Sequence, residues 1–264
     1  MRSVAVLPDR TSLTRAVADR IVAVAEEAIR ERGRFTWALS GGRTPSELYM
    51  LLASPEWSKR IDWSRVHFFW GDERCVPPDH RDSNYRMASD TLLSAVHAPP
   101  ENVHRMRGEL EPGEAASRYD RELRQTLEGE LRNTFPRLDL VLLGMGADGH
   151  TASLFPGSLA LTERERAVVA TTVLVGGEMG APASGVLARP GAGANQRLTL
   201  TLPMISAART VVFLVAGADK ASRLLDVLSG QHPGPPYPAE LVRPEGGAQW
   251  FVDRAAHAKV DSGR

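Results

Sequence analysis

LDLVLLGMGADGHTASLFPG, residues 138–157, is the stretch that decides the fold predicted for this chain. Its first part, Leu138 to Leu143, is mostly apolar, as is typical of a strand buried in a sheet. The second part is a turn with three glycines within six residues, which allow torsions and close ligand approach that side chains would block. The stretch therefore predicts a strand that delivers Asp148 and His150 to the edge of a sheet.

Asp148 and His150 have the clearest chemical meaning in this turn. A carboxylate can hold an imidazole in the tautomer that takes a proton from water near neutral pH. We expect both residues to be catalytic, and Gly146 in the same turn is a candidate contact to the substrate. The alternative is that the imidazole only caps the turn.

The same order of strand, polar turn and helix recurs along the chain. Phe35–Leu39 and Val66–Trp70 are apolar strands, and Pro45 fits the first turn of a helix that continues to Leu52. The other predicted strands are Ala167–Val175, Leu198–Leu202 and Thr210–Val215, and the other predicted helices are Thr11–Arg32, Asn84–Val96, Glu114–Leu131, Asp219–Leu228 and a C-terminal helix from Asp253.

This alternation predicts an α/β fold, with a Rossmann-like, mostly parallel sheet and helices on both faces. Ligands of such folds bind outside the carboxyl ends of the strands, so the polar turns after residues 39, 70 and 143 are expected to share one pocket. We expect residues 1–264 to form a single domain, with residues 158–200 as a candidate small lid subdomain. Gly176–Gln196 and Gln231–Pro238 show no periodicity and are predicted to be loops.

Composition excludes several classes of partner. The 32 basic residues balance 32 acidic ones, so no net charge attracts nucleic acid or an anionic membrane. The single cysteine, Cys75, cannot form an internal disulfide and suits a reducing compartment. No signal-peptide core and no apolar run long enough for a membrane span occur, which predicts a cytoplasmic location.

The turn between the first apolar strand and its helix is a candidate phosphate site. It offers backbone amides, two hydroxyls, a guanidinium and the positive end of a helix dipole to an anion. It lacks the lysine and the spacing of a Walker loop, and the alternative is an ordinary tight turn with a helix cap. The candidate ligands are Ser40, Gly41, Gly42, Arg43 and Thr44.

Three charged residues, Asp72, Glu73 and Arg74, follow the strand Val66–Trp70. Unpaired charges beside a buried strand are costly, so we expect them to pair with one another or with a ligand. A solvated salt-bridge cluster is the alternative. Cys75 beside Arg74 is a weaker candidate nucleophile, because it precedes Val76-Pro77-Pro78 and has no paired histidine nearby in sequence.

Lys220 follows the strand Thr210–Val215 and is a fourth polar group at a strand end. It is either a phosphate ligand or a solvated helix residue. His67 and His80 are expected to be structural, because no short spacing of metal-ligand type appears and no metal is predicted.

Six blocks in this order closely resemble the 6-phosphogluconolactonases, within the superfamily that includes glucosamine-6-phosphate deaminases. The blocks are SGGRTP (40–45), GDERCVP (71–77), SNYRMA (83–88), LGMGADGHTASLFP (143–156), RLTLT (197–201) and AGADKA (216–221). The resemblance implies hydrolysis of 6-phospho-D-glucono-1,5-lactone to 6-phosphogluconate, in the oxidative pentose phosphate pathway, with no cofactor. The stretch Gly176–Gln196 departs from the pattern of the family.

The polar turns motivate a hypothesis for the roles of the site residues. His150, oriented by Asp148, activates water, and Arg74 stabilises the oxyanion together with backbone amides of the glycine turn. Lys220 and Arg197 join Ser40 to Thr44 in holding the phosphate, and Asp72 orients either Arg74 or a sugar hydroxyl. The expected partner is a small phosphosugar lactone, and the chain is expected to be a monomer or a homodimer.

One residue separates this chain from its deaminase relatives. In the deaminases a glutamate stands before the proline of the Asp-Gly-His block, whereas this chain has Phe155 there, which disfavours deaminase or isomerase chemistry. A sugar-phosphate sensor is the second alternative. Sensors of related fold carry an N-terminal DNA-binding helix pair, whereas here the first predicted helix leads directly to a strand and the phosphate turn.

Overall fold

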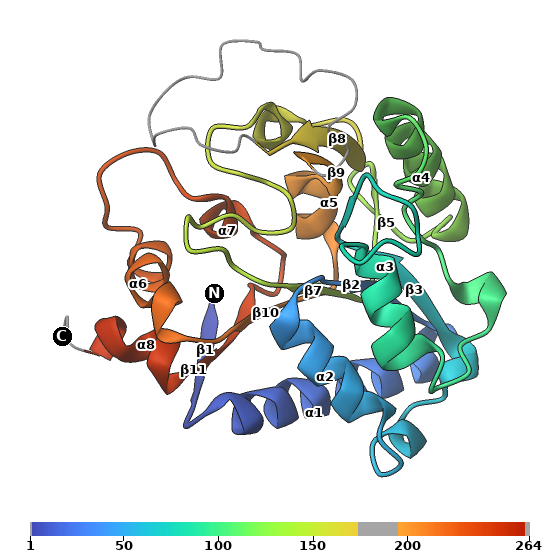
Figure 1. Ribbon diagram of the computed structural model, residues 1–264, viewed down its shortest axis with the longest axis horizontal. Helices are drawn as coiled ribbons and strands as arrows, with labels where there is room; N and C mark the ends of the chain where they lie inside the picture. Colours follow the sequence, from blue (N-terminus) through green and yellow to red (C-terminus); the bar gives the residue numbers. More distant parts are fainter. Residues whose placement is uncertain (1, 174–194, 262–264) are drawn as a thin grey trace.

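A computed structural model describes residues 2–173 and 195–261 of the chain. Its main sheet has six parallel strands in the order β1-β11-β10-β7-β2-β3, which run through the middle of the molecule (Figure 1). The strands are β1 (Ser3–Leu7), β2 (Phe35–Leu39), β3 (Val66–Trp70), β7 (Leu140–Leu143), β10 (Thr210–Val215) and β11 (Gln249–Asp253). The prediction of an α/β fold with a mostly parallel sheet is confirmed.

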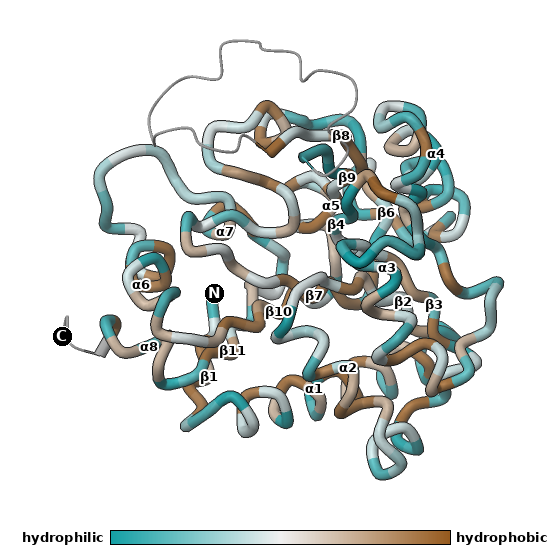
Figure 2. Tube along the Cα trace, viewed as in Figure 1, coloured by the Kyte–Doolittle hydropathy of each residue, from teal (hydrophilic) through white to brown (hydrophobic). Residues whose placement is uncertain are grey.

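Helices cover both faces of this sheet, as predicted. In Figure 1, α1 and α2 lie side by side on one face, and α5 and α7 lie on the other side. The tube in Figure 2 is brown along the central strands and teal over many of the loops, so the apolar core lies between these layers. The helices are α1 (Arg10–Arg32), α2 (Arg43–Ala53), α3 (Asn84–Ala88), α4 (Pro112–Thr126), α5 (Leu202–Ala207), α6 (Ala221–Ser229), α7 (Pro238–Leu241) and α8 (Arg254–Asp261).

Two of the predicted strands belong to a second, smaller sheet. β8 (Val168–Thr172) and β9 (Gln196–Leu200) pair antiparallel with each other, and β9 pairs antiparallel with β4 (Asp72–Arg74). Only Gly71 separates β3 from β4, so the small sheet begins directly at the edge of the main one. The lid expected at residues 158–200 stays a prediction, and most of the loop expected at Gly176–Gln196 lies outside the described residues.

Other boundaries differ from the sequence prediction for local reasons. The helix expected at Asn84–Val96 is α3 followed by a π-helical turn, Ser89–Leu93. The helix expected at Glu114–Leu131 ends at Thr126, before a two-stranded pair of β5 (Leu131–Arg132) and β6 (Phe135–Pro136). β1 and β11 were not predicted, because short runs of this kind have no clear period.

The direction of the chain reverses between β2 and β7. From β2 the chain continues outward to β3, whereas from β7 it continues through β10 to β11 on the other side. At the amino ends of these two strands, the Asp139 carboxylate accepts hydrogen bonds from Thr36 N and Thr36 Oγ1, each at 2.8 Å. Arg32 Nε donates to the same carboxylate at 2.9 Å. Asp139 is buried, so these bonds hold β2 beside β7.

Asp139→Asn should therefore lower the free energy of unfolding by about 3 kcal/mol, because it leaves the Arg32 guanidinium without its buried carboxylate. Urea unfolding measures this loss. Asp90→Asn is the matched control, since the exposed Asp90 carboxylate pairs only with Arg86 on the same helical segment and should cost about 0.5 kcal/mol or less. Equal losses in the two variants would contradict the role of Asp139.

Candidate active site

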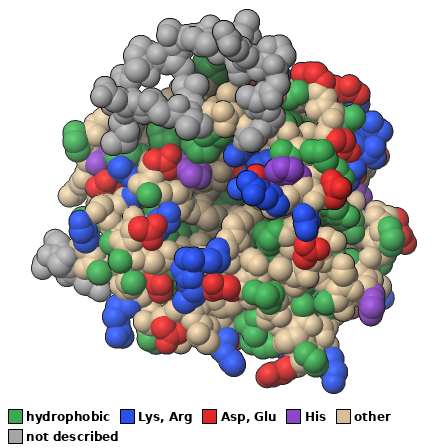
Figure 3. Space-filling model, in the orientation of Figure 1, with side chains coloured by type: hydrophobic (Ala, Val, Ile, Leu, Met, Phe, Trp, Pro, Cys, Tyr) green, Lys and Arg blue, Asp and Glu red, His purple; other side chains and the backbone are tan. Residues whose placement is uncertain are grey.

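The predicted polar turns all lie at the carboxyl ends of parallel strands, around the point where the sheet reverses. Ser40 follows β2, Asp72 follows β3 after one residue, and the turn of His150 follows β7. Ligands of open parallel sheets bind at such a switch point. Figure 3 shows a hollow near the middle of one face, bordered by Lys and Arg side chains in blue and by a purple His.

Asp148 and His150 form a short hydrogen bond across the glycine turn. Nδ1 of His150 lies 2.6 Å from Oδ1 of Asp148, and the backbone N–H of His150 donates to the same oxygen at 3.2 Å. An ionised carboxylate can only accept, so Nδ1 carries the proton and Nε2 is left to accept one. The His150 side chain is 32% exposed, so Nε2 can meet water or a ligand.

The pKa of Asp148 follows from this contact. Partial burial alone would raise the pKa of Asp148, but the hydrogen bonds and charge of His150 outweigh burial and lower it. The carboxylate is therefore ionised throughout the neutral range, as an orienting group must be.

Gly146 makes room for this pair. A Cβ atom at Gly146 would lie 2.2 Å from Nδ1 of His150 and 2.5 Å from Oδ1 of Asp148, closer than atoms can approach. Its α-carbon faces Asp148 and His150, and its contact to substrate stays a prediction. Arg223 of α6 supports the turn from outside, donating from Nε to the Ala147 carbonyl at 3.2 Å.

The turn at Ser40 is held by a buried phenol. Tyr49 Oη accepts a hydrogen bond from Ser40 N and donates to Ser40 O, both at 2.9 Å, and burial raises the pKa of Tyr49. Helix α2 begins at Arg43 without a side-chain cap, and Arg43 itself is exposed. The amino end of α2 and the Arg43 guanidinium therefore face solvent and suit an anion.

Asn84 connects the Ser40 turn to Asp72. A Cβ atom at Gly41 would lie 2.0 Å from Oδ1 of Asn84, so the Asn84 amide packs directly on the glycine backbone. Asn84 Nδ2 donates to the Asp72 carbonyl at 2.9 Å and to Asp72 Oδ1 at 3.2 Å. On the other side, Ser153 Oγ donates to Asp72 Oδ2 at 2.6 Å. These contacts join all three predicted turns.

Glu73 has a structural role. Its buried carboxylate accepts bonds from Ser83 Oγ and from the backbone N–H groups of Arg74, Asn84 and Tyr85. Burial raises the pKa of Glu73 even against these four hydrogen bonds. Charged residues 72–74 were expected to pair with one another or with a ligand. Glu73 instead pairs with groups at the amino end of α3.

Arg74 and Arg197 lie opposite each other on β4 and β9. Burial, together with the positive charge of Arg74, lowers the pKa of Arg197, as expected for two guanidinium groups held close together. Arg74 Nη1 donates to the Asp82 carbonyl at 2.6 Å, while both Asp72 oxygens are bound by Asn84 and Ser153. Within the described residues no hydrogen bond or ion pair joins Asp72 to Arg74, and the hypothesis that Asp72 orients Arg74 or a sugar hydroxyl stays a prediction.

Lys220 and Cys75 are the two remaining candidate residues. Lys220 follows β10, and its Nζ lies 3.1 Å from the exposed carboxylate of Asp219, so its role as a phosphate ligand stays a prediction. Burial raises the pKa of Cys75 to about 11, so its thiol stays protonated and is a poor nucleophile.

Sequence reasoning missed three residues of this site: Tyr49, Asn84 and Ser153. Asn84 and Ser153 stood inside blocks that carried the family resemblance, but nothing in their spacing showed that both reach Asp72. Within residues 2–173 and 195–261, no group of three His, Cys, Asp or Glu side chains could hold a metal ion. In that same part of the chain, no helix has the length and apolar character needed to cross a membrane.

Comparisons with known proteins place this geometry in a family. Residues 8–251 match the family described as glucosamine-6-phosphate isomerases/6-phosphogluconolactonase. A 6-phosphogluconolactonase of Nostoc is 40% identical over 98% of both chains, and one of Synechocystis is 42% identical over 87% of this chain and 86% of its own. The structure of a 6-phosphogluconolactonase from Trypanosoma cruzi is similar with a TM-score of 0.81, at 28% identity over 98% of this chain and 97% of its own.

The pKa of Asp148 provides a test of the pair. The carboxyl should titrate below its ordinary pKa of 3.8, so the stability it contributes is present above that pH and is lost as the pH falls through the folded-state value. His150→Ala should raise the pKa of Asp148, because it removes the hydrogen bond and charge of the imidazole while burial remains. A ¹³C NMR titration measures both values, with the exposed His97→Asn as control. An unchanged pKa in His150→Ala would contradict the pairing.

Proposed function

The chain belongs to the glucosamine-6-phosphate isomerase/6-phosphogluconolactonase family, and we propose that it hydrolyses 6-phospho-D-glucono-1,5-lactone to 6-phospho-D-gluconate in the oxidative pentose phosphate pathway. The observation that carries the proposal is the 2.6 Å hydrogen bond between Asp148 and His150 at the carboxyl end of β7. This pair supplies the base that ester hydrolysis needs. Its position at the switch point of the sheet is where a small ligand binds.

Phe155 favours lactone hydrolysis over deamination. Its ring lies against the imidazole of His150, with centroids 4.4 Å apart. In the deaminases this motif resembles Asp-Gly-His-Ile-Ala-Phe-Asn-Glu-Pro, with a glutamate at the position of Phe155. A phenyl ring cannot exchange a proton with the imidazole. Opening an amino-sugar ring needs that second acid, whereas lactone hydrolysis needs only activated water and a stabilised oxyanion.

His150 acts as the general base in the proposed mechanism. Nε2 takes a proton from a water molecule while the water oxygen bonds to the lactone carbonyl carbon, and the carbonyl π electrons move to oxygen. The tetrahedral intermediate collapses, the bond to the ring oxygen breaks, and Nε2 returns its proton to that oxygen. Asp148 holds Nδ1–H throughout and stabilises the imidazolium between the two steps.

Arg74 stabilises the oxyanion in this proposal, with Arg197 beside it. The two guanidinium groups lie opposite each other on one strand pair and repel each other, and an anion beside them would relieve this repulsion. A donor aimed at an oxyanion is typically worth about 3 to 4 kcal/mol of transition-state stabilisation. Asp72, which accepts hydrogen bonds from Asn84 and Ser153, fixes the turns around the substrate in this proposal.

The phosphate of the substrate is assigned to the turn Ser40–Thr44. The uncapped amino end of α2 and the exposed Arg43 support this assignment, and Lys220 approaches from the carboxyl end of β10. Holding the phosphate fixes the lactone carbonyl near His150. Positioning of this kind can supply much of the catalysis for a substrate that also hydrolyses unaided.

His150→Asn should lower kcat for the lactone by about a hundredfold or more, because asparagine cannot act as a base. Affinity for 6-phosphogluconate should change little. A pH-stat assay with the spontaneous rate subtracted measures turnover, and calorimetry measures binding. His97→Asn, at an exposed histidine, is the matched control and should keep wild-type turnover. Wild-type turnover in His150→Asn would rule out the general-base assignment.

Arg43→Ala should raise KM for the lactone by about tenfold with kcat nearly unchanged, because it removes a charged hydrogen bond made equally to substrate and transition state. Arg15→Ala, at an exposed arginine of α1, serves as control with unchanged KM. Initial rates over a range of lactone concentrations separate the two constants. A fall in kcat alone would instead assign Arg43 to the carbonyl.

A further inference from the structure

The His150 turn, residues 144–150, is held from outside by a proline-rich segment that the proposed mechanism does not use. Residues 231–238 contain four prolines and lead directly into α7. The Ala239 N–H of α7 donates a hydrogen bond to the Gly149 carbonyl at 3.1 Å. Figure 1 shows α7 beside the loop that follows β7. Two segments far apart in the sequence therefore meet at the residue that precedes His150.

Tyr237 packs directly on the backbone of this turn. A Cβ atom added at Gly149 would lie 2.9 Å from the β-carbon and the ring of Tyr237, closer than atoms can approach. Gly149 also has a φ of +84°, a conformation that favours glycine. Its N–H donates to the Gly146 carbonyl at 3.0 Å, and the Gly146 N–H donates to the His150 carbonyl at 2.9 Å. These bonds couple the position of Gly149, and hence its contact with Tyr237, to that of His150.

Two side chains hold the Tyr237 ring in place. The guanidinium carbon of Arg223 lies 3.9 Å from the centre of the ring, and the centroid of the His232 ring lies 4.5 Å from it. A guanidinium over an aromatic face is attracted by the negative charge of that face. Within the part of the chain that the structure describes, the Tyr237 hydroxyl makes no hydrogen bond, so the ring alone makes these contacts.

Arg223 and His232 are themselves fixed by further partners. Arg223 Nη1 donates to Asp226 Oδ2 at 2.9 Å, and Arg223 Nε donates to the Ala147 carbonyl at 3.2 Å. His232 Nε2 lies 3.0 Å from Glu240 Oε2, and these two side chains are only 6% and 11% exposed. Arg223 therefore supports the His150 turn twice, once directly and once through the tyrosine ring.

The prolines restrict the backbone that carries Tyr237. Pro236 and Pro238 flank it, and a residue that precedes proline is confined to extended conformations; Tyr237 has φ −70° and ψ 148°. Fewer conformations are then lost when the chain folds, which favours one fixed placement of the ring. The side chains of Asp148 and His150 are 42% and 32% exposed, so their turn has solvent on one side and depends on such contacts for its order.

We propose that Tyr237 is a positioning residue for the Asp148–His150 pair. Its ring fixes the backbone of Gly149 and so keeps the Asp148 carboxylate within hydrogen-bond distance of Nδ1 of His150. Arg223 holds the ring and also supports the turn on the other side of Asp148. The effect on turnover rests on the proposed lactonase function, whereas the effect on the pair itself does not.

Tyr237→Ala should raise the pKa of Asp148, because a loosened turn weakens the hydrogen bond from His150 that lowers it. It should also lower kcat for the lactone by about tenfold or more while KM stays within about twofold, because the proposed phosphate contacts are unchanged. A ¹³C NMR titration of the Asp148 carboxyl and initial rates over a range of lactone concentrations measure the two effects. Tyr237→Phe keeps the ring and should restore the wild-type values of both.

Arg223→Gln tests the support of the ring. It removes the guanidinium from the tyrosine face and should move the pKa of Asp148 and kcat in the same directions as Tyr237→Ala. Arg118→Gln, at an exposed arginine of α4, is the matched control and should change neither. Tyr237→Leu, which lacks a ring face, takes the place of Tyr237→Ala should the alanine variant not fold.

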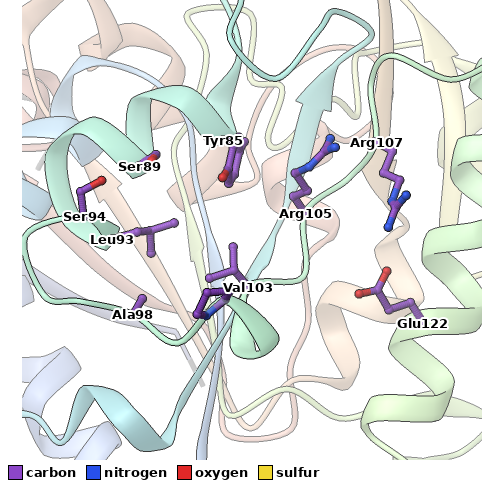
Figure 4. Close-up of a pocket in the computed structure, with 10 residues that line it drawn as sticks. Tyr85, Ser89, Leu93, Ser94, Ala98, Val103, Arg105, Arg107 and Glu122 are labelled. Carbon is purple, nitrogen blue, oxygen red and sulfur yellow. The ribbon is translucent and has the colours of Figure 1, made fainter.

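Tyr85→Ala separates positioning from a general loss of packing. Tyr85 is half-buried like Tyr237, and its ring also packs on an aromatic neighbour and an arginine, Trp70 and Arg105. It lines a surface cavity between α3 and α4 whose lining residues all lie between positions 85 and 122 (Figure 4). Tyr85→Ala should therefore lower the melting temperature without moving the pKa of Asp148.

Four results would overturn the proposal. The first is a wild-type pKa of Asp148 in both Tyr237→Ala and Arg223→Gln, and the second is an equal rise of that pKa in Tyr85→Ala. The third is a higher KM with unchanged kcat in the Tyr237 and Arg223 variants, which would make these residues substrate ligands. The fourth is a Tyr237→Phe variant that behaves like Tyr237→Ala, which would assign the effect to the hydroxyl. A wild-type chain that turns over no lactone would contradict the proposed function alone, and the titration would still decide the positioning.

Discussion

The carboxylate of Asp72 is the contact on which the candidate active site depends. One of its oxygens accepts from Asn84, whose amide lies against Gly41 of the Ser40 turn, and the other accepts from Ser153, three residues after His150. The single carboxylate of Asp72 thus connects turns that follow three different strands. Asp72 therefore anchors the turns around the candidate site.

The contacts of Asp72 lie at the carboxyl end of the sheet, and the buried contacts of Asp139 lie at the amino end. Asp139, with Thr36 and Arg32, joins β2 to β7 at their amino ends, while Ser40 and the His150 turn follow the carboxyl ends of the same strands. The two strands on either side of the reversal are therefore fixed below the site. Loops above them can carry the glycine turns of the candidate site without loosening the core.

Much of the fold could be predicted, and the errors have a common cause. Strands β2, β3 and β10 have the predicted bounds, because strands buried on both faces are continuous apolar runs that end at polar or glycine residues. β1 and β11 were missed because five residues of mixed character fit several structures. β4 was taken for a turn, because its pairing with β9 joins residues more than a hundred positions apart.

The sequence by itself determined the chemistry: which strands end in polar turns, that Asp148 and His150 stand together, and that Phe155 replaces an acid. These are local facts, set by spacing along one segment. Only the tertiary structure decided the partners of Asp72, the pairing of Arg74 with Arg197, and the structural role of Glu73. Those contacts join distant segments, and their distances depend on how the strands are ordered in the sheet, which no local pattern records.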